Sequence, residues 1–307
     1  MIQNEKKFSF RELRAEASAL IALIPRLRGK QIKVRPLKGG LTNRNYRLDS
    51  EGERFVLRVM GDNSTLLGIN RRAEHACLQA AHALGIGPEV MAFFPEKGAL
   101  VTRFVTGRVL VPQALKRPAV LRRVIASLRL YHDKSKAAGT FSAFDTVHRY
   151  YAQGRKRKVA FPQSIPRALG ILARLEEERG VPDRMCPCHN DLLSSNLVDD
   201  QRMVWILDWE YGGAGDLFFD LGNLAANNLF DRDQESLLLQ FYFGKTRAAD
   251  LRRLRLMRLA SDMREAMWGF LQTRISKLDF DYQTYARRHY KRFLQGAERA
   301  ARQHGWV

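Results

Sequence analysis

The hydrophobic pattern of the chain changes near Gly107, and this change constrains the fold more than any other feature. Before it, five short runs have the composition of β-strands: 32–37, 45–48, 55–59, 89–94 and 99–104. After it, apolar residues recur at the three- and four-residue spacing of a buried helix face, as at 121–131, 171–175, 251–271 and 282–294. One irregular stretch at 188–220, with a strand at 203–207, interrupts the helices. The pattern predicts an α+β protein in which sheet and helices are segregated.

Two helical patterns belong to the β-rich part of the chain. One, at 8–27, precedes the first strand, and the other, at 73–84, separates the third strand from the fourth. We therefore predict a small antiparallel β lobe over residues 1–103, joined by a hinge at 103–107 to a larger helical lobe over residues 104–307. The length of 307 residues suits this division into two units.

The net charge of +20 raises nucleic acid as a partner, but its distribution argues against that function. The stretch 186–230 holds seven acidic residues and one base, Arg202, and so carries −6 inside a basic chain. Clustered carboxylates repel one another unless a cation is bound between them. The one compact basic run, 155–158, is predicted to be a solvated surface loop. We expect a cation site at the acidic stretch and no main role in nucleic-acid binding.

The chain contains no apolar run of the roughly eighteen residues that a membrane span requires. Its first residues lack the apolar core of a secretory signal. Cys186 and Cys188 are too closely spaced for a zinc chelate and have no second ligand pair, so we expect buried thiols. These features predict a cytoplasmic protein without a membrane partner.

The acidic stretch contains the pattern His-Asn-Asp-Leu-Leu-Ser-Ser-Asn at 189–196, followed by the strand that ends at Asp208. This is the H-x-D-L-x-x-x-N spacing of a kinase catalytic loop with a metal-binding aspartate on the next strand. Phosphoryl transfer needs a carboxylate that takes the proton of the attacking hydroxyl, and we predict that Asp191 is this base. It also needs hard oxygen ligands for Mg²⁺, which Asn196 and Asp208 can supply.

The β lobe offers a matching site for phosphates. A loop between the first two strands, formed by Gly39, Gly40, Leu41, Thr42 and Asn43, is predicted to cover the phosphates with its backbone. In the third strand, alternation places Arg58 on the face opposite to its apolar neighbours. Glu74 on the following helix is predicted to hold the Arg58 guanidinium in place beside the phosphates.

Together, the segments GGLTNRNY, FVLRV, CHNDLLSSN, ILDWEY and MWGFLQTRISKLDFDYQTYA resemble the choline/ethanolamine kinase group, bacterial type, of the aminoglycoside phosphotransferase-like superfamily. The resemblance covers about residues 39–290. It implies a two-lobed protein-kinase-like fold that uses ATP and Mg²⁺, with Asp191 as base and Asn196 and Asp208 as metal ligands. It also implies nucleotide contacts at the loop 39–43, Arg58, Glu74 and the hinge residues Thr102, Arg103 and Phe104.

The acceptor site implied by the resemblance is an aromatic pocket for a cationic alcohol. Tyr211, Trp268 and Tyr285 resemble the walls of the choline pocket, and aromatic faces bind quaternary ammonium groups. Choline kinases of higher organisms carry a second Trp three positions before Trp268, where this chain has Glu265. A carboxylate there would accept hydrogen bonds from a primary ammonium, so we expect lower selectivity for choline over ethanolamine. Glu210 is a further candidate for the acceptor site.

Several alternatives stay open at this point. The same chemistry could serve another cationic alcohol, such as an aminoglycoside or thiamine, and a basic nucleic-acid-binding protein on a kinase-like scaffold is the rival from another class. Trp268 and Tyr285 also suit plain helix–helix packing. Asp216 and Asp220 either brace the catalytic loop or cap the helix predicted to begin after Asp220, and His132 caps or packs. The sequence leaves the oligomeric state open, a dimer included.

Overall fold

The structure is a computed structural model that describes residues 18–37, 43–61, 63–182 and 184–304. Residues 8–17 of the predicted leading helix and residues 39–42 of the predicted phosphate loop lie outside the described residues. Residues 18–21 are helical, and the short 3-10 helix η1 (Pro25–Leu27) follows them. Leu20, Ile21, Ile24 and Leu27 are buried against the sheet that comes next.

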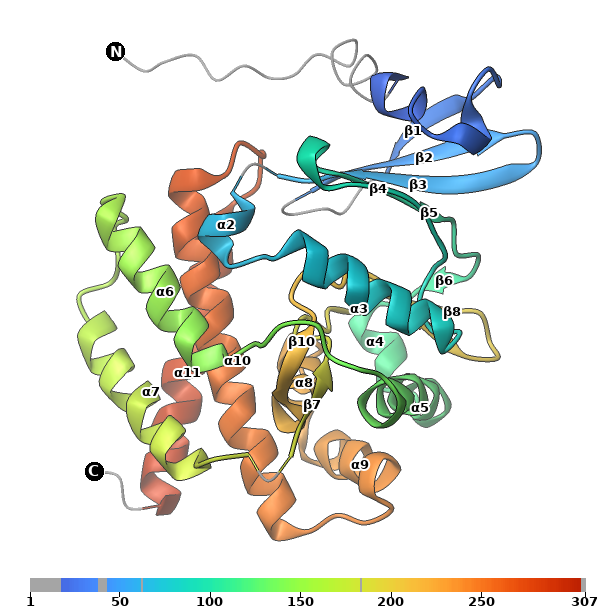
Figure 1. Cartoon of the computed structure of the whole chain (residues 1–307). Coiled ribbons are helices and arrows are strands. Elements are labelled where there is room, and N and C mark those ends of the chain that lie inside the picture. The colour runs from blue at the N-terminus through green and yellow to red at the C-terminus, as the bar shows by residue number, and fades with distance from the viewer. Residues whose placement is uncertain (1–17, 38–42, 62, 183, 305–307) are drawn as a thin grey trace.

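The β lobe is one antiparallel sheet with the strand order β1-β2-β3-β5-β4, as the five runs predicted (Figure 1). Its strands are β1 (Lys33–Leu37), β2 (Arg44–Ser50), β3 (Glu53–Val59), β4 (Val90–Phe94) and β5 (Ala99–Arg103). In β3, the side chains of Phe55, Leu57 and Val59 are buried in the core of this lobe. Because successive side chains of a strand alternate between faces, Val56 and Arg58 point to the opposite face, toward the helical lobe.

Three further elements connect and cover this sheet. The short helix α2 (Ser64–Leu67) precedes α3 (Arg71–Ala83), whose N-cap is Asn70. The Asn70 side chain accepts from the backbone N–H groups of Arg72 and Ala73, which fixes the start of α3. The 3-10 helix η2 (Pro95–Lys97) makes the turn between β4 and β5. In Figure 1, α3 lies between the sheet and the helical lobe.

The rest of the chain is mainly helical, which confirms the α+β, two-lobed fold. Its helices are α4 (Pro112–Leu115), α5 (Pro118–Lys134), α6 (Ala143–Lys156), α7 (Ile165–Arg179), α8 (Leu217–Asn227), α9 (Arg232–Phe243), α10 (Ala248–Ile275) and α11 (Tyr282–His304). Its short strands are β6 (Arg108–Val109), β7 (Met185–Cys188), β8 (Leu197–Asp199), β9 (Val204–Ile206) and β10 (Gly213–Asp216), and η3 (Ser194–Asn196) lies between β7 and β8. The strands form two small antiparallel sheets, β10-β7 and β6-β8-β9.

Helix α10 is the centre of the helical lobe. It packs against α6, α8 and α11, and Figure 1 shows it running the length of the lobe between them. Every residue from Leu259 to Gln272 is buried, so this helix has no solvent face over that stretch. Its side chains therefore point into the core, into α11 and into the cleft between the lobes.

Two sequence predictions need correction or limits here. The basic run Arg155 to Lys158 is not a free loop, because Arg155 and Lys156 form the last turn of α6 and the following residues make the turn after it. The predicted strand at 203–207 is shorter, as β9, and pairs with β8.

No helix in the described part of the chain has the length and apolar character needed to cross a bilayer.

The contact between α10 and α11 is close at one glycine. A Cβ at Gly269 would lie 2.9 Å from the Cβ of Ala286 and 3.1 Å from Cδ1 of Tyr285. We expect Gly269→Val to lower the free energy of unfolding in urea by about 1–3 kcal/mol, because the added atoms force the helices apart. Gly170→Val is the matched control, since nothing lies within 4 Å of a Cβ there on α7. Equal stability of both variants would contradict the close packing.

Candidate active site

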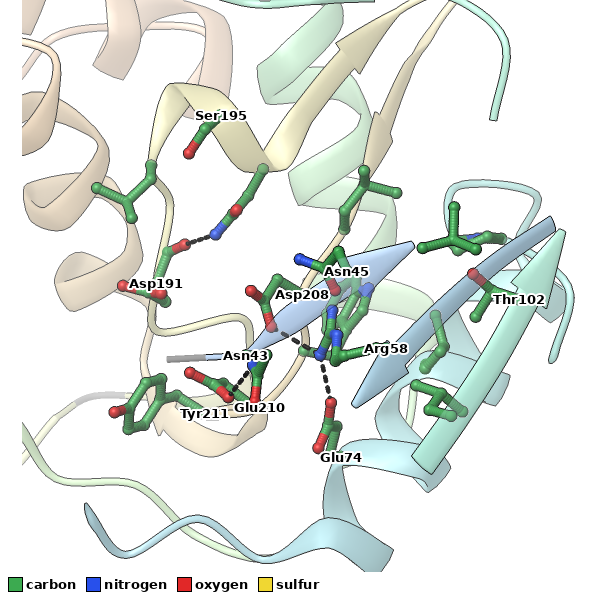
Figure 2. Close-up of a pocket in the computed structure, with 18 of the residues that line it drawn as sticks. Asn43, Asn45, Arg58, Glu74, Thr102, Asp191, Ser195, Asp208, Glu210 and Tyr211 are labelled. Carbon is green, nitrogen blue, oxygen red and sulfur yellow. Dashed lines mark hydrogen bonds and ion pairs between the residues drawn. The ribbon is translucent and has the colours of Figure 1, made fainter. Parts of the chain in front are cut away.

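A cavity of about 370 Å³ lies between the two lobes. Its walls come from β3 and β5, the hinge, the loop after β7, the segment after β9, and α10. Every predicted site residue that the structure describes lines it: Asn43, Arg58, Glu74, Thr102, Arg103, Phe104, Asp191, Asn196, Asp208, Glu210, Tyr211, Glu265, Trp268 and Tyr285. Figure 2 shows Arg58 between Asp208 and Glu74, in contact with both. The structure thus brings together residues that are up to 242 positions apart (43 to 285).

A buried carboxylate, that of Asp220, accepts hydrogen bonds from the backbone of the loop that carries Asp191. Asp220, on α8, accepts from the backbone N–H of His189 at 2.7 Å and of Asn190 at 2.6 Å. Asn190 has a φ of 64°, in the left-handed region that Asn tolerates better than most residues. Asp220 therefore braces the catalytic loop, one of the two roles left open by the sequence. Asp216 has a capping role, because it accepts from the N–H of Phe218 at 2.9 Å. The helix that it caps, α8, begins at Leu217 and not after Asp220 as predicted.

The His189 ring ties the loop to the strand that leads to Asp208. Its Nδ1 accepts from the backbone N–H of Asp191 at 3.2 Å, so its Nε2–H donates to the carbonyl oxygen of Leu207 at 2.8 Å. Burial lowers the pKa of His189, which keeps the ring neutral and preserves this donor–acceptor pattern. The histidine of the motif thus sets the spacing between Asp191 and Asp208.

A second support for this loop comes from the same helix, α8. Asn223, on α8, accepts from the N–H of Leu192 at 2.5 Å and donates to the hydroxyl of Ser261 on α10 at 2.9 Å. All three residues are buried. The catalytic loop is therefore joined through α8 to the central helix of the lobe.

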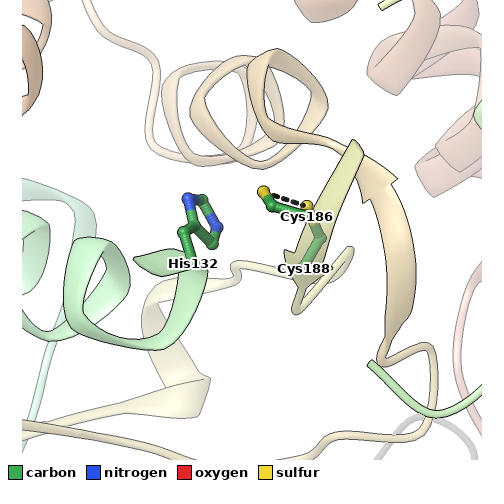
Figure 3. A group of neighbouring side chains, drawn as sticks. All are labelled: His132, Cys186 and Cys188. Atoms are coloured by element: carbon green, nitrogen blue, oxygen red, sulfur yellow. Dashed lines mark hydrogen bonds between the residues drawn. The ribbon is translucent and has the colours of Figure 1, made fainter. Parts of the chain in front are cut away.

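Behind Asp220 lies a buried cluster of His132, Cys186 and Cys188, whose potential ligand atoms lie within 4.8 Å of one another (Figure 3). Both ring nitrogens of His132 are engaged, Nε2 with Asp220 at 3.0 Å and Nδ1 with the hydroxyl of Tyr242 at 2.7 Å. Burial raises the pKa of the Cys188 thiol. The prediction of buried thiols and a packing histidine is confirmed: the cluster positions Asp220.

Asp191 is buried at the floor of the cavity. Its Oδ1 accepts from Nη1 of Arg264 at 3.1 Å, and its backbone carbonyl accepts from the Asn196 side chain at 3.0 Å. Burial raises the pKa of Asp191 to about 7; Arg264 opposes this shift, and the carboxylate of Glu265 adds to it. A carboxylate with a pKa near neutrality is suited to take up a proton from a hydroxyl at physiological pH.

Asn196 and Asp208 supply the oxygen donors that a hard divalent cation requires. The Asn196 amide nitrogen is fixed by its bond to the Asp191 carbonyl, which leaves its oxygen for the cavity. Asp208 has a φ of 65°, and its Oδ1 forms an ion pair with Nη1 of Arg58 at 2.8 Å. Carboxylate and amide oxygens are the ligands that Mg²⁺ prefers, so the residues present fit this ion.

Arg58 is the centre of a polar network that joins the lobes. Its Nη1 also donates to Oε1 of Glu74 at 2.6 Å, as the sequence predicted. Burial alone would lower the pKa of Arg58. The carboxylates of Asp208 and Glu74 outweigh burial and raise this pKa above its usual value. The guanidinium is thus a fixed positive charge on the cavity wall.

Arg71, which the sequence analysis missed, extends this network. Its Nη1 donates to Glu74 at 2.7 Å and to Glu210 at 3.2 Å. Glu210 also accepts from the amide of Asn43 at 3.0 Å, a contact visible in Figure 2. The signal for Arg71 was available, since it precedes Glu74 by three positions on one helix face. Glu210 therefore links the large lobe to the small one.

The end of the cavity nearest the hinge is largely apolar, with Val56, Leu78 and Leu100 among its walls. This slot suits a planar base. The N–H groups of Arg103 and Phe104 are already bonded, to the carbonyls of Glu89 and Arg54 at 2.8 and 2.9 Å. These two predicted residues line the slot, but their N–H groups belong to the backbone hydrogen bonding of the sheet.

The opposite end holds the predicted aromatic residues. Trp268 and Tyr285 pack edge to face with centroids 5.6 Å apart, and both also line the cavity. The Tyr285 hydroxyl donates to Oε2 of Glu265 at 2.6 Å, and Arg264 donates to Oε1. Glu265, which we expected to offer its carboxylate to an acceptor, is therefore bonded at both oxygens. Burial raises its pKa, but Arg264 and His289 outweigh burial and lower it, so the carboxylate stays charged.

Arg264 is the second residue that the sequence analysis missed. Only 2% of its side chain is exposed, and its Cζ lies 4.5 Å from the centroid of the Tyr211 ring. It precedes Trp268 by four positions on α10, so both side chains face the cavity. That spacing was the signal that could have identified it.

Comparisons with known proteins agree with this geometry. Residues 33–257 match the model of the phosphotransferase enzyme family. The protein LicA of Haemophilus influenzae is 29% identical over 212 residues, 68% of this chain and 62% of that protein. Ethanolamine kinase 2 of Mus musculus is 26% identical over 296 residues, 86% of this chain and 76% of that protein.

Among solved structures, a choline/ethanolamine kinase family protein from Mesorhizobium loti is similar, with a TM-score of 0.79 and 28% identity. The superposition covers 93% of this chain and 95% of that one. The match to the family model includes the sheet, the hinge, the catalytic loop and Asp208. On this match and on the shared fold, the chain belongs to the phosphotransferase enzyme family.

Proposed function

We propose that this protein is an ATP-dependent kinase that transfers the γ-phosphoryl group to the hydroxyl of ethanolamine or choline. The observation that carries the proposal is that one cavity contains a buried carboxylate, two hard oxygen donors, a fixed arginine and an aromatic, acidic end. The similarity to an ethanolamine kinase and to a choline/ethanolamine kinase family protein supports the class of acceptor.

The nucleotide is proposed to lie with its base in the apolar slot at the hinge. Arg58 would then contact the phosphates, oriented by Glu74 at 2.6 Å. Asn196 and Asp208 would hold Mg²⁺, which when bound neutralises charge on the phosphates. Arg71 and Glu210 keep the two walls of the cavity at a fixed separation.

The chemical step is assigned to Asp191. Its Oδ1 is held by Arg264, so Oδ2 can accept the hydrogen bond of the acceptor hydroxyl. The carboxylate orients this hydroxyl toward the γ-phosphorus and takes its proton as the new P–O bond forms, while the bond from the γ-phosphorus to the β–γ bridging oxygen breaks and ADP leaves. The positive head group of the acceptor would lie toward Trp268 and Tyr285, where aromatic surface and the charge of Glu265 meet.

Acceptor-dependent ADP formation tests this function. Purified protein with ATP and Mg²⁺ should release ADP when ethanolamine or choline is added, and ³¹P NMR should detect the phosphomonoester product. EDTA should abolish the reaction, because hard oxygen ligands alone leave the phosphate charge unscreened. An aminoglycoside and thiamine complete the panel. If the protein phosphorylates an aminoglycoside or thiamine but neither ethanolamine nor choline, the proposal is wrong.

A further inference from the structure

The acceptor end of the cavity already contains a cation that belongs to the protein. The Arg264 guanidinium lies over the face of Tyr211, with Cζ 4.5 Å from the ring centroid. This is the geometry in which an aromatic face binds a cation. The ring that the sequence analysis assigned to the head group of the acceptor is therefore covered.

The same guanidinium also occupies the nearby anions. Its Nη1 donates to Oδ1 of Asp191 at 3.1 Å and to Oε1 of Glu265. Its Nη2 lies 3.4 Å from the carbonyl oxygen of Asn190. With 2% of its side chain exposed, Arg264 has no solvent route by which to leave without a change in α10 or the loop. It is a permanent part of the pocket wall.

A quaternary ammonium group and a primary ammonium group need different contacts from this part of the cavity wall. A quaternary group has no N–H, so it depends on aromatic faces, and here Tyr211 is covered while Trp268 and Tyr285 meet edge to face. A primary ammonium donates hydrogen bonds, and each oxygen of Glu265 retains a second lone pair after accepting from Arg264 or Tyr285. The smaller head group also needs less of the remaining space.

We propose that Arg264 is a specificity-determining residue that excludes quaternary ammonium groups by occupying the Tyr211 face with a fixed positive charge, so that the pocket favours a primary amino alcohol. The inference rests on the proposed function and deepens it. Arg264 also acts as a positioning residue for Asp191, through the bond to Oδ1.

The test is the ratio of kcat/KM for choline to kcat/KM for ethanolamine. In the wild type we expect this ratio to be below one. Arg264→Ala removes the guanidinium together with most of the side chain, which uncovers the Tyr211 ring, so the ratio should rise by about tenfold or more. The variant also loses the donor to Asp191, and part of it could unfold. Each of these effects lowers kcat/KM for choline and for ethanolamine by the same factor, so neither changes the ratio.

Two variants serve as controls. Arg264→Lys keeps a positive charge over Tyr211 and should stay within about threefold of the wild-type ratio. Arg258→Ala makes the matched change at an arginine of the same helix that pairs with Glu235, and it should not change the ratio. An unchanged ratio in Arg264→Ala, or a wild type that prefers choline, would overturn the inference while leaving the kinase function intact. Wild-type protein that phosphorylates neither alcohol would overturn the proposed function itself.

Discussion

Asp191→Asn is expected to lower kcat for phosphoryl transfer by about 10²–10⁴, the usual contribution of a general base. The amide oxygen of Asn can still accept from Arg264, so the loop should keep its position while the proton acceptor is lost. Steady-state assays with whichever acceptor supports ADP formation give kcat. Isothermal titration calorimetry should show an unchanged Kd for ATP.

The matched control for this variant is Asp145→Asn, an exposed aspartate in the first turn of α6. It changes the net charge by the same amount outside the cavity and should leave kcat within about twofold, as surface substitutions generally do. If Asp191→Asn keeps wild-type turnover, another group must take the proton, and the assignment of the base is wrong.

Asp208→Asn is expected to raise the Mg²⁺ concentration needed for half-maximal activity by roughly tenfold or more, together with a fall in kcat. The substitution removes one charged oxygen ligand but keeps an oxygen that can face Arg58, so the ion pair is weakened and the backbone is retained. Asn196→Ala should act in the same direction, because it deletes the other oxygen donor. A titration of activity against free Mg²⁺ at saturating ATP measures both effects.

A surface carboxylate controls for the loss of charge. Asp133→Asn removes an exposed aspartate that pairs with Arg184, and its Mg²⁺ dependence should match the wild type. If the Mg²⁺ curve of Asp208→Asn also overlaps the wild-type curve, this carboxylate does not hold the metal. The proposed nucleotide arrangement would then have to change.

The parts of the site that the sequence predicted are those fixed by local spacing. His189, Asp191 and Asn196 lie on one loop, and the β8–β9 hairpin returns the chain so that Asp208 lies beside it. Alternation in β3 was sufficient to place Arg58 on the cavity face. For such residues the backbone geometry of a few neighbouring positions determines where the side chain points.

Local spacing could place Arg71 and Arg264 on the cavity side of their helices, but the partners of Arg264 and Glu210 depend on contacts between distant segments. Arg264 meets Asp191 over 73 positions, and Asn43 meets Glu210 over 167. No spacing rule connects such pairs, because the approach of α10 to the loop is decided by packing of the whole helical lobe. For the same reason β6 was not predicted: a two-residue strand exists only because β8 pairs with it.

The hydrogen bonds that join Leu192 to Ser261 through Asn223 limit how the acceptor specificity of this pocket could change. Helix α10 carries Arg264, Glu265 and Trp268 on its cavity side, and the same helix anchors the loop that holds the catalytic carboxylate. Sliding or tilting α10 to admit a new acceptor would therefore also displace that carboxylate. We therefore expect a change of acceptor to be reached by exchanging individual side chains on this helix, with the adjacent positions 264 and 265 as the first candidates.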